Sequence, residues 1–319
     1  MPDNPVPENP AQPRVAPGDY AAAARRIAPY VRRTPLLTVR ADGREVSLKL
    51  EHLQAAGVFK IRGALNALLA EPEGGRPDAS VVTASGGTHG LGVATAASWL
   101  SVPATVYVPV TVPDIKASRI AATGAEVVKT GRVYADAERA ARAFAAGDGR
   151  FYVHAYDDPA VVAGQGTLAA EIVADLPECD VVAVPVGGGG LLAGVSGGLA
   201  ALGRATVVVG VEPEGCPTLH AAVEAGEPVD VGADSVAASA LGASRIGGLA
   251  LAAYRVNPVS LALVSDKEII AARDRLWEEF RLAVEPAAAT VFAAWLSGQV
   301  PGAHPCLVLS GANATWTPA

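Results

Sequence analysis

One lysine and one run of glycines are the residues of this sequence best suited to covalent and anion-binding chemistry. Lys60 stands between Phe59 and Ile61, in a chain with only five lysines among its 25 basic residues. Burial among apolar neighbours would lower the pKa of its amine and favour the neutral nucleophile that imine formation with an aldehyde requires. A surface lysine with a buried stem and a solvated ammonium is the alternative interpretation of the same residues.

Four consecutive glycines, Gly187 to Gly190, join an apolar β-branched run at 180–186 to a helical pattern. Backbone N–H groups at such a helix start converge on an anion, most naturally a phosphate. A plain strand-to-helix turn needs fewer glycines, because each one adds chain entropy that folding must remove. Two ligands fit this phosphate site. A dinucleotide would use Glu212, after the next strand, to bind a ribose, whereas pyridoxal phosphate would need a lysine amine.

The elements that position these residues alternate between short apolar runs and longer helical patterns. This order predicts an α/β fold with open, largely parallel twisted sheets and flanking helices. In such sheets ligands bind at the carboxyl ends of strands, where small polar segments occur at 84–90, 187–190 and 310–313. We expect strands at 46–51, 80–84, 104–108, 126–129, 151–153, 180–186, 206–211, 261–264 and 305–309, and helices at 20–28, 88–99, 113–123, 134–146, 159–175 and 266–280.

Composition excludes several classes of partner. The net charge of −7 and the pI near 5.3 argue against nucleic acid and anionic membranes. No apolar run reaches the length of a membrane span. The Pro-rich segment 1–17 lacks the features of a signal peptide, so we expect a disordered or extended tail. Three separated cysteines without a C-x-x-C pair favour a reducing cytoplasm and no zinc site.

Taken together, these segments resemble fold type II pyridoxal-phosphate enzymes, which are similar in fold to tryptophan synthase β. The serine/threonine dehydratase and serine racemase branch is the best match, over about residues 18 to 315. The resemblance implies a large cofactor domain at 18–81 and 154–319, a small domain at 82–153, and a homodimer. The motifs that carry it are Phe59-Lys60-Ile61-Arg62-Gly63-Ala64, Ala84-Ser85-Gly86-Gly87-Thr88-His89, Gly187 to Gly190, Glu285-Pro286 and Ser310-Gly311-Ala312-Asn313.

The resemblance also implies roles. Lys60 would be joined to pyridoxal phosphate and act as the base at the substrate Cα, Gly187 to Gly190 would hold the phosphate, and Ser310 would bond the pyridine nitrogen. Ser85 and Tyr134 are further catalytic candidates. The remaining cofactor-binding candidates are Phe59, Thr88, Glu285 and Asn313, and the candidates for the substrate carboxylate are Ser85, Gly86, Gly87, Thr88 and His89.

Three departures from the branch bear on the reaction. Thr88 stands where the branch has Asn, and Gly86 where racemases have their second serine. Glu212 is a weak metal candidate because its usual acidic partner is Thr218 here, so we expect no metal.

A serine hydroxyl keeps a pyridine less protonated than a carboxylate does, which favours prompt β-elimination. The sequence therefore predicts an ammonia-lyase that converts L-serine, L-threonine or a related β-substituted amino acid to a 2-oxo acid and ammonia. Racemisation, β-replacement, dinucleotide binding and a catalytically decayed protein are the alternatives.

Overall fold

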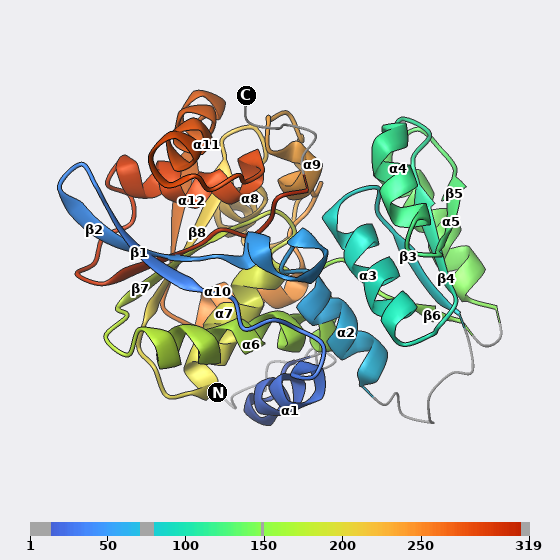
Figure 1. Cartoon of the computed structure of the whole chain (residues 1–319). Coiled ribbons are helices and arrows are strands. Elements are labelled where there is room, and N and C mark those ends of the chain that lie inside the picture. Colours follow the sequence, from blue (N-terminus) through green and yellow to red (C-terminus); the bar gives the residue numbers. More distant parts are fainter. Residues whose placement is uncertain (1–13, 71–79, 148–149, 314–319) are drawn as a thin grey trace, which may run out of the picture.

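The computed structural model describes residues 14–70, 80–147 and 150–313, which form two sheets with helices on both faces of each (Figure 1). The larger sheet has six strands, all parallel except the edge strand β1, which pairs antiparallel with β2. In spatial order its strands are β1 (Leu36–Ala41), β2 (Arg44–Lys49), β10 (Pro305–Val308), β7 (Val181–Pro185), β8 (Val207–Pro213) and β9 (Val259–Val264).

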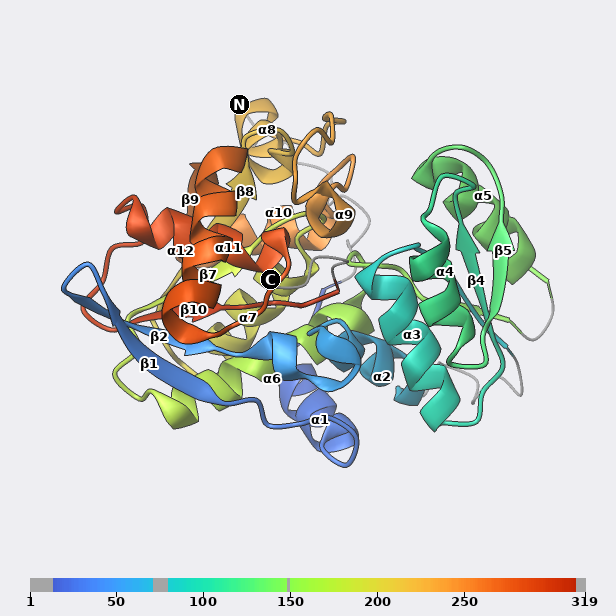
Figure 2. The same cartoon turned by 45° about the horizontal axis from the view of Figure 1, so that its top comes forward.

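The smaller sheet has four parallel strands and belongs to the middle of the chain. It forms a separate lobe beside the larger sheet (Figure 1 and Figure 2). The strands are, in spatial order, β5 (Glu126–Lys129), β4 (Ala104–Val108), β3 (Val81–Ala84) and β6 (Phe151–Tyr152). The domain boundaries proposed from the sequence stay a prediction, although all four strands fall close to the range 82–153.

Each sheet buries side chains on both faces, because parallel strands with apolar residues at successive positions require cover on both sides. Val208 and Val209 of β8 belong to different core clusters. The cluster of Val209 includes α9 (Ala238–Leu241), α11 (Asp266–Phe280) and α12 (Pro286–Leu296). The cluster of Val208 includes α6 (Pro159–Asp175), α7 (Gly190–Ala201), α8 (Thr218–Ala225) and α10 (Gly248–Val256).

The smaller sheet is covered in the same way. One of its core clusters joins it to α1 (Pro17–Ile27), α2 (Ile61–Leu69), α3 (Thr88–Trp99) and α4 (Asp114–Ala121), and the other to α5 (Tyr134–Ala145). Helix α2 also packs against α6 of the larger lobe. There is no room for a Cβ at Gly164 of α6, because it would lie 2.6 Å from the carbonyl oxygen of Arg62 in α2. The two lobes are therefore joined by closely packed helices.

The predicted fold class is confirmed, and every predicted strand is present to within two residues at each end. Strand β1 was not predicted. Its hairpin turns at Asp42 and Gly43, which have φ of 50° and 74°, and a D-G pair suits that turn. The helix expected from residue 20 begins earlier, at Pro17. Most of the predicted tail at 1–17 lies outside the described residues.

Among the described helices, none is both long enough and apolar enough to pass through a bilayer. The described helices with the most apolar sequences are instead the buried ones, α6, α7 and α12, which pack on the larger sheet.

A buried network of charges lies where α2, α6 and β2 meet. Arg62 donates to both carboxylate oxygens of Glu51 at 2.8 Å and to Glu171 at 2.7 Å. Lys49 is fully buried and lies 2.8 Å from Glu171. Because Lys60 immediately precedes α2, this network fixes the helix that carries the candidate nucleophile.

We expect Arg62→Ala to lower the free energy of unfolding by about 3–5 kcal/mol, because it leaves the buried Glu51 carboxylate without its cation. Urea denaturation of the cofactor-free protein measures this. Arg40→Ala, on the exposed strand β1, is the matched control and should change stability by less than about 0.5 kcal/mol. The double variant with Glu51→Gln and Arg62→Met should recover part of the loss. Equal effects of Arg62→Ala and Arg40→Ala would contradict a structural role for the network.

Candidate active site

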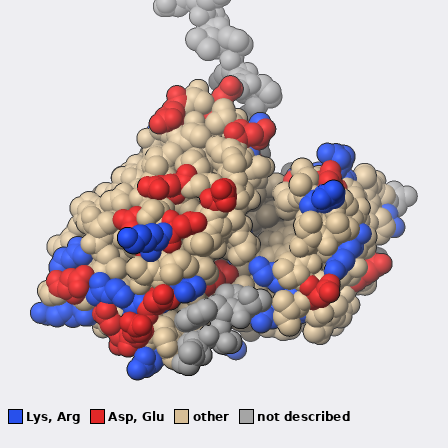
Figure 3. Space-filling model, turned by 90° about the horizontal axis from the view of Figure 1, so that it is seen from above, with Lys and Arg blue, Asp and Glu red and all other residues tan. Residues whose placement is uncertain are grey.

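The predicted residues meet in a hollow between the larger lobe and the smaller lobe, which the space-filling view shows (Figure 3). Strands of both sheets end at it. Gly187 follows β7, Ser310 follows β10, and Ser85 follows β3. Two adjoining cavities lie there, and Lys60, Thr88 and Tyr156 line both of them. One contains the glycine run and the other contains the 85–89 loop. These cavities lie where ligands bind in open parallel sheets, at the carboxyl ends of strands.

Lys60 is half-buried at the N-terminus of α2 and points into both cavities. Its Nζ donates to the carbonyl oxygen of Ala155 at 3.1 Å and lies 5.1 Å from the ring centroid of Phe59. Burial lowers the pKa of Lys60 to about 8, against the opposing charge of Glu285. A pKa of about 8 gives this amine a much larger neutral fraction near physiological pH than an ordinary lysine has, which suits a nucleophile. The solvated surface lysine considered above does not fit this environment.

The four glycines form the turn between β7 and α7, and all four line the first cavity. Gly189 is the N-cap of α7 with φ of 85°, and no side chain caps the start of the helix. A Cβ at Gly188 would lie 2.2 Å from the ring of Tyr156, and one at Gly190 would lie 2.8 Å from its carbonyl oxygen. The uncapped N–H groups of α7 thus face a space that only a glycine backbone can line, which is the geometry of a phosphate cradle.

Two polar residues face the glycine cradle. Ser310 is buried and lines the first cavity together with Glu285, the N-cap of α12. Burial raises the pKa of Glu285 to about 7, although the charges of Lys116 and Lys60 act to lower it. The Glu285 backbone N–H donates to the carbonyl oxygen of Gly311 at 3.1 Å. This bond holds the start of α12 against the loop after β10.

The second cavity has a volume of about 330 Å³ and contains the predicted substrate-binding residues Ser85 to His89. Thr88 begins α3, so the first N–H groups of that helix are turned toward the cavity. Burial, followed by the charge of Lys60, lowers the pKa of His89 to about 3. Its Nε2 lies 3.2 Å from the carbonyl oxygen of Val153. His89 is therefore a neutral ring held by the backbone, and it positions the loop without contributing a charge.

Tyr134 is the first residue of α5 and lines the second cavity. Its hydroxyl is buried and makes no hydrogen bond with the described residues. Burial raises the pKa of this phenol well above its ordinary value, as does the neighbouring Tyr152. The hydroxyl is therefore a neutral, buried group beside the side chain of Tyr152.

Two predicted candidates lie elsewhere. Asn313 lines neither cavity, and its side-chain oxygen accepts a bond from Arg119 of α4 at 3.1 Å. Glu212 is buried in β8, and its oxygens accept bonds from the side chain of Thr218, the backbone of Leu219 and both the backbone and ring of His220. The single hydrogen of the Thr218 hydroxyl can go either to Glu212 or to the carbonyl oxygen of Gly187. The carboxylate is thus enclosed by groups of the chain itself, and the described residues contain no metal-ligating cluster.

Sequence reasoning missed two residues that line the site. Tyr156 covers the glycine cradle, and Lys116 of α4 lines the second cavity. Lys116 could have been found, because the segment after the predicted strand at 104–108 is another strand carboxyl end. Tyr156 has no local signal, since its position depends on the close approach of its ring to Gly188.

The residues present fit pyridoxal phosphate. The uncapped start of α7 suits a phosphate, the Lys60 amine with its lowered pKa suits an aldehyde, and the Ser310 side chain lines the same cavity. The ring of Tyr156 also lines this cavity, next to Gly188.

Comparison with known proteins gives the same cofactor. A family model described as "Pyridoxal-phosphate dependent enzyme" matches residues 27–311. The L-threonine ammonia-lyase of Thermotoga maritima is 36% identical over 92% of this chain and 75% of that protein. The L-threo-3-hydroxyaspartate ammonia-lyase of Saccharomyces cerevisiae is 33% identical over 93% of this chain and 92% of that protein. The crystal structure of the T.th. threonine deaminase superposes with a TM-score of 0.87 at 37% identity, covering 96% of this chain and 100% of that one.

From the raised pKa of Glu285 we can predict how the stability of the cofactor-free protein depends on pH. Its folded pKa of about 7 lies above the unfolded value, so the folded state binds the extra proton, and stability falls as pH rises from about 4 to 7. Glu285→Gln removes this loss. We expect the variant to be more stable than the parent at pH 8 by on the order of 2 kcal/mol, with a much smaller gap at pH 4.5.

Chemical denaturation at the two pH values measures the difference in free energy of unfolding between the variant and the parent. Glu45→Gln, in the exposed part of β2, is the control and should show no such pH dependence. If the stability difference between Glu285→Gln and the parent does not change with pH, the pKa of the Glu285 carboxyl is not raised by folding.

Proposed function

The chain belongs to the family of pyridoxal-phosphate dependent enzymes, and on that premise we propose that it is an ammonia-lyase acting on β-hydroxy amino acids. It would convert L-serine, L-threonine or a related substrate to a 2-oxo acid and ammonia. The observation that carries the proposal is the convergence of Lys60, the glycine cradle and an adjoining cavity of about 330 Å³. That volume is in the range of small-molecule sites.

When bound, pyridoxal phosphate supplies an electron sink for the bond that breaks at the substrate Cα. Gly187 to Gly190 and the start of α7 would hold its phosphate, and Ser310 would face its ring nitrogen. Lys60 would hold the cofactor's aldehyde carbon before substrate arrives. Phe59, Thr88 and Glu285 line the remaining wall, and the placement of Asn313 against Arg119 supports a less direct role for that residue.

On the substrate side, the backbone N–H groups around Ser85 to Thr88 would bind the α-carboxylate at the start of α3. The freed Lys60 amine would take the Cα proton, which its lowered pKa favours. The β-hydroxyl then departs with a proton as water, and the released enamine hydrolyses to the 2-oxo acid and ammonia. Tyr134, which lines the same cavity, would be a further candidate for contact with the departing group.

The environment of Gly86 supports elimination over racemisation. A racemase needs a second acid/base group on the face opposite Lys60. A Cβ at Gly86 would lie 2.3 Å from a methyl carbon of Val112. A serine therefore cannot occupy this position without moving Val112.

The proposal includes a cytoplasmic homodimer. The support for the compartment is that Cys179, Cys216 and Cys306 are all free thiols in the described structure, as expected in a reducing environment. The support for the dimer is the resemblance to the dehydratase and racemase branch.

We expect Lys60→Ala to abolish ammonia release from L-serine and L-threonine, lowering kcat/KM by at least about 10³-fold. The purified parent should show a visible absorption band that borohydride removes, with the label on Lys60 by peptide mass mapping. Lys267→Ala, on the exposed start of α11, is the matched control and should keep both properties. A chain without ammonia-lyase activity on any β-hydroxy amino acid, or accumulation of the substrate's mirror image, would overturn the proposal.

The position of Lys116 in the wall of the second cavity leads to a prediction about which substrate the enzyme prefers. A cation in the wall of the substrate cavity favours a second carboxylate on the substrate. We expect Lys116→Met to lower kcat/KM for L-threo-3-hydroxyaspartate roughly tenfold more than for L-threonine. The two substrates are assayed on the same preparation, so that any general loss cancels in the ratio. An unchanged ratio would place the Lys116 ammonium away from the substrate side chain.

A further inference from the structure

A second cavity system lies on the far side of the glycine cradle, between α7, α10 and the segment that enters α1. Its volume is about 460 Å³, which is larger than the substrate cavity. None of its lining residues belongs to the two catalytic cavities. The proposed reaction therefore leaves it unused. Its size falls in the range typical of sites for small organic molecules.

The walls of this cavity are mostly small and apolar. Gly197 and Ala193 of α7 form one side, and Leu249, Ala253 and Val256 of α10 form the other. These residues leave space because they have short side chains or lie at the rim, where Val256 is 79% exposed. An apolar ligand body would gain contacts along both helices and remove this surface from water.

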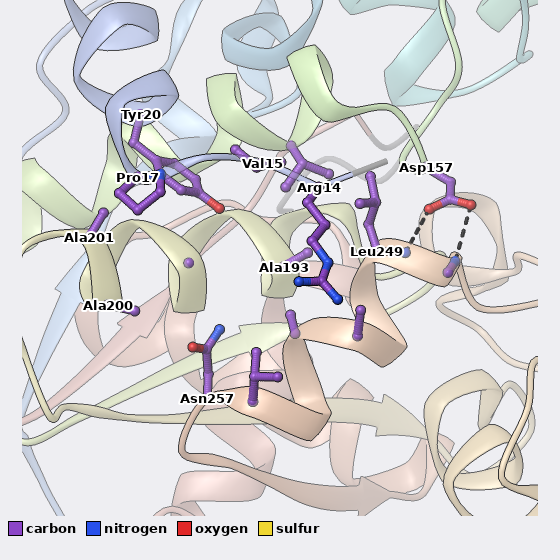
Figure 4. Close-up of a pocket in the computed structure, with 16 residues that line it drawn as sticks. Arg14, Val15, Pro17, Tyr20, Asp157, Ala193, Ala200, Ala201, Leu249 and Asn257 are labelled. Atoms are coloured by element: carbon purple, nitrogen blue, oxygen red, sulfur yellow. Dashed lines mark hydrogen bonds between the residues drawn. The ribbon is translucent and has the colours of Figure 1, made fainter. Parts of the chain in front are cut away.

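The polar groups of the cavity gather around one cation. Figure 4 shows the Arg14 side chain pointing between α7 and α10, with Tyr20 and Asn257 on one side and Asp157 on the other. Arg14 and Asp157 are the only charged residues in the lining. Both carboxylate oxygens of Asp157 already accept bonds, from the backbone N–H groups of Gly248 at 3.1 Å and Leu249 at 2.9 Å.

Arg14, by contrast, has no hydrogen bond or ion pair with any residue in the described part of the chain. Two further groups can help to bind a ligand. The Tyr20 hydroxyl lies over Gly197, where an added Cβ would be 2.0 Å from it. The Asn257 amide donates to Ser196 at 3.2 Å, which leaves its carbonyl oxygen free to accept.

We propose that this cavity is a second binding site, for a small organic monoanion such as a carboxylate that carries a ring or a branched hydrocarbon body. The anionic group would bind the Arg14 guanidinium, and the hydrocarbon body would lie between α7 and α10. A single cation in a chain of net charge −7 does not suit a polyphosphate or another polyanion. A cationic ligand would be repelled by Arg14.

The test uses the pyridoxal-phosphate-loaded enzyme and 1-anilinonaphthalene-8-sulfonate, which joins one sulfonate to an apolar ring system. Isothermal titration should show one site per chain that L-serine and L-threonine do not displace. Its uncharged analogue N-phenyl-1-naphthylamine should bind on the order of tenfold more weakly, because it lacks the charge-assisted bond.

Two variants localise the site. Arg14→Gln removes the cation, and Val256→Asp adds an acid at an exposed rim position that tolerates substitution. Each should weaken binding of the sulfonate by on the order of tenfold. Arg40→Gln makes the same charge change as Arg14→Gln at an exposed position on β1 and should leave binding unchanged. Thermal unfolding of each variant confirms that it is folded.

Several results would overturn the proposal. Binding that neither Arg14→Gln nor Val256→Asp weakens would place the probe elsewhere, and displacement by L-serine would place it in the catalytic cavity. Binding that appears only after removal of residues 2–13 would mean that the chain's own N-terminus fills the cavity. Binding that is lost as protein concentration rises would mean that a second copy covers it.

Discussion

The desolvation of one amine is the constraint on which the rest of the site depends. In water almost none of the Lys60 amine would be neutral at neutral pH, and burial raises that neutral fraction by lowering the pKa to about 8. The ring of Phe59 and the carbonyl oxygen of Ala155 surround the amine without supplying a carboxylate in hydrogen-bond contact. Glu285 is the nearby acid, and its own burial keeps it partly protonated. The raised pKa of Glu285 reduces the negative charge beside the amine, and so limits how far that carboxyl can raise the pKa of Lys60.

This arrangement requires α2 to be rigid, since Lys60 lies at its first turn. The Arg62 network supplies that rigidity from the opposite side of the helix start, through bonds to Glu51 and Glu171. Buried ion networks of this kind contribute little net stability compared with apolar packing. What they provide is a defined geometry, because each partner fits only one arrangement. The position of the nucleophile is thus set by residues that never contact a ligand.

Local patterns predicted most of the fold, and they singled out several of the residues that meet in the hollow between the two lobes. Buried parallel strands are continuous apolar runs, so their ends were found to within two residues, and the glycine run and Lys60 were recognisable by composition alone. The parts that failed depend on tertiary contacts. Asn313 was expected beside the cofactor but binds Arg119, and Tyr156 was not singled out although it packs on Gly188. Neither contact can be predicted from the spacing of apolar residues along the sequence, because each contact joins segments that are far apart in the chain.

Tyr156 and its neighbour Asp157 line two different cavities. Tyr156 faces the catalytic side, where its ring covers Gly188. Asp157 faces the Arg14 side, where its carboxylate caps α10. The backbone N–H of Gly247, just before α10, donates to the carbonyl oxygen of Gly188 at 3.0 Å. The segment that begins α10 is therefore hydrogen-bonded directly to the glycine run, and Asp157 ties the start of the same helix to the segment that carries Tyr156. The catalytic cavity and the Arg14 cavity are thus separated by backbone that is hydrogen-bonded on both sides.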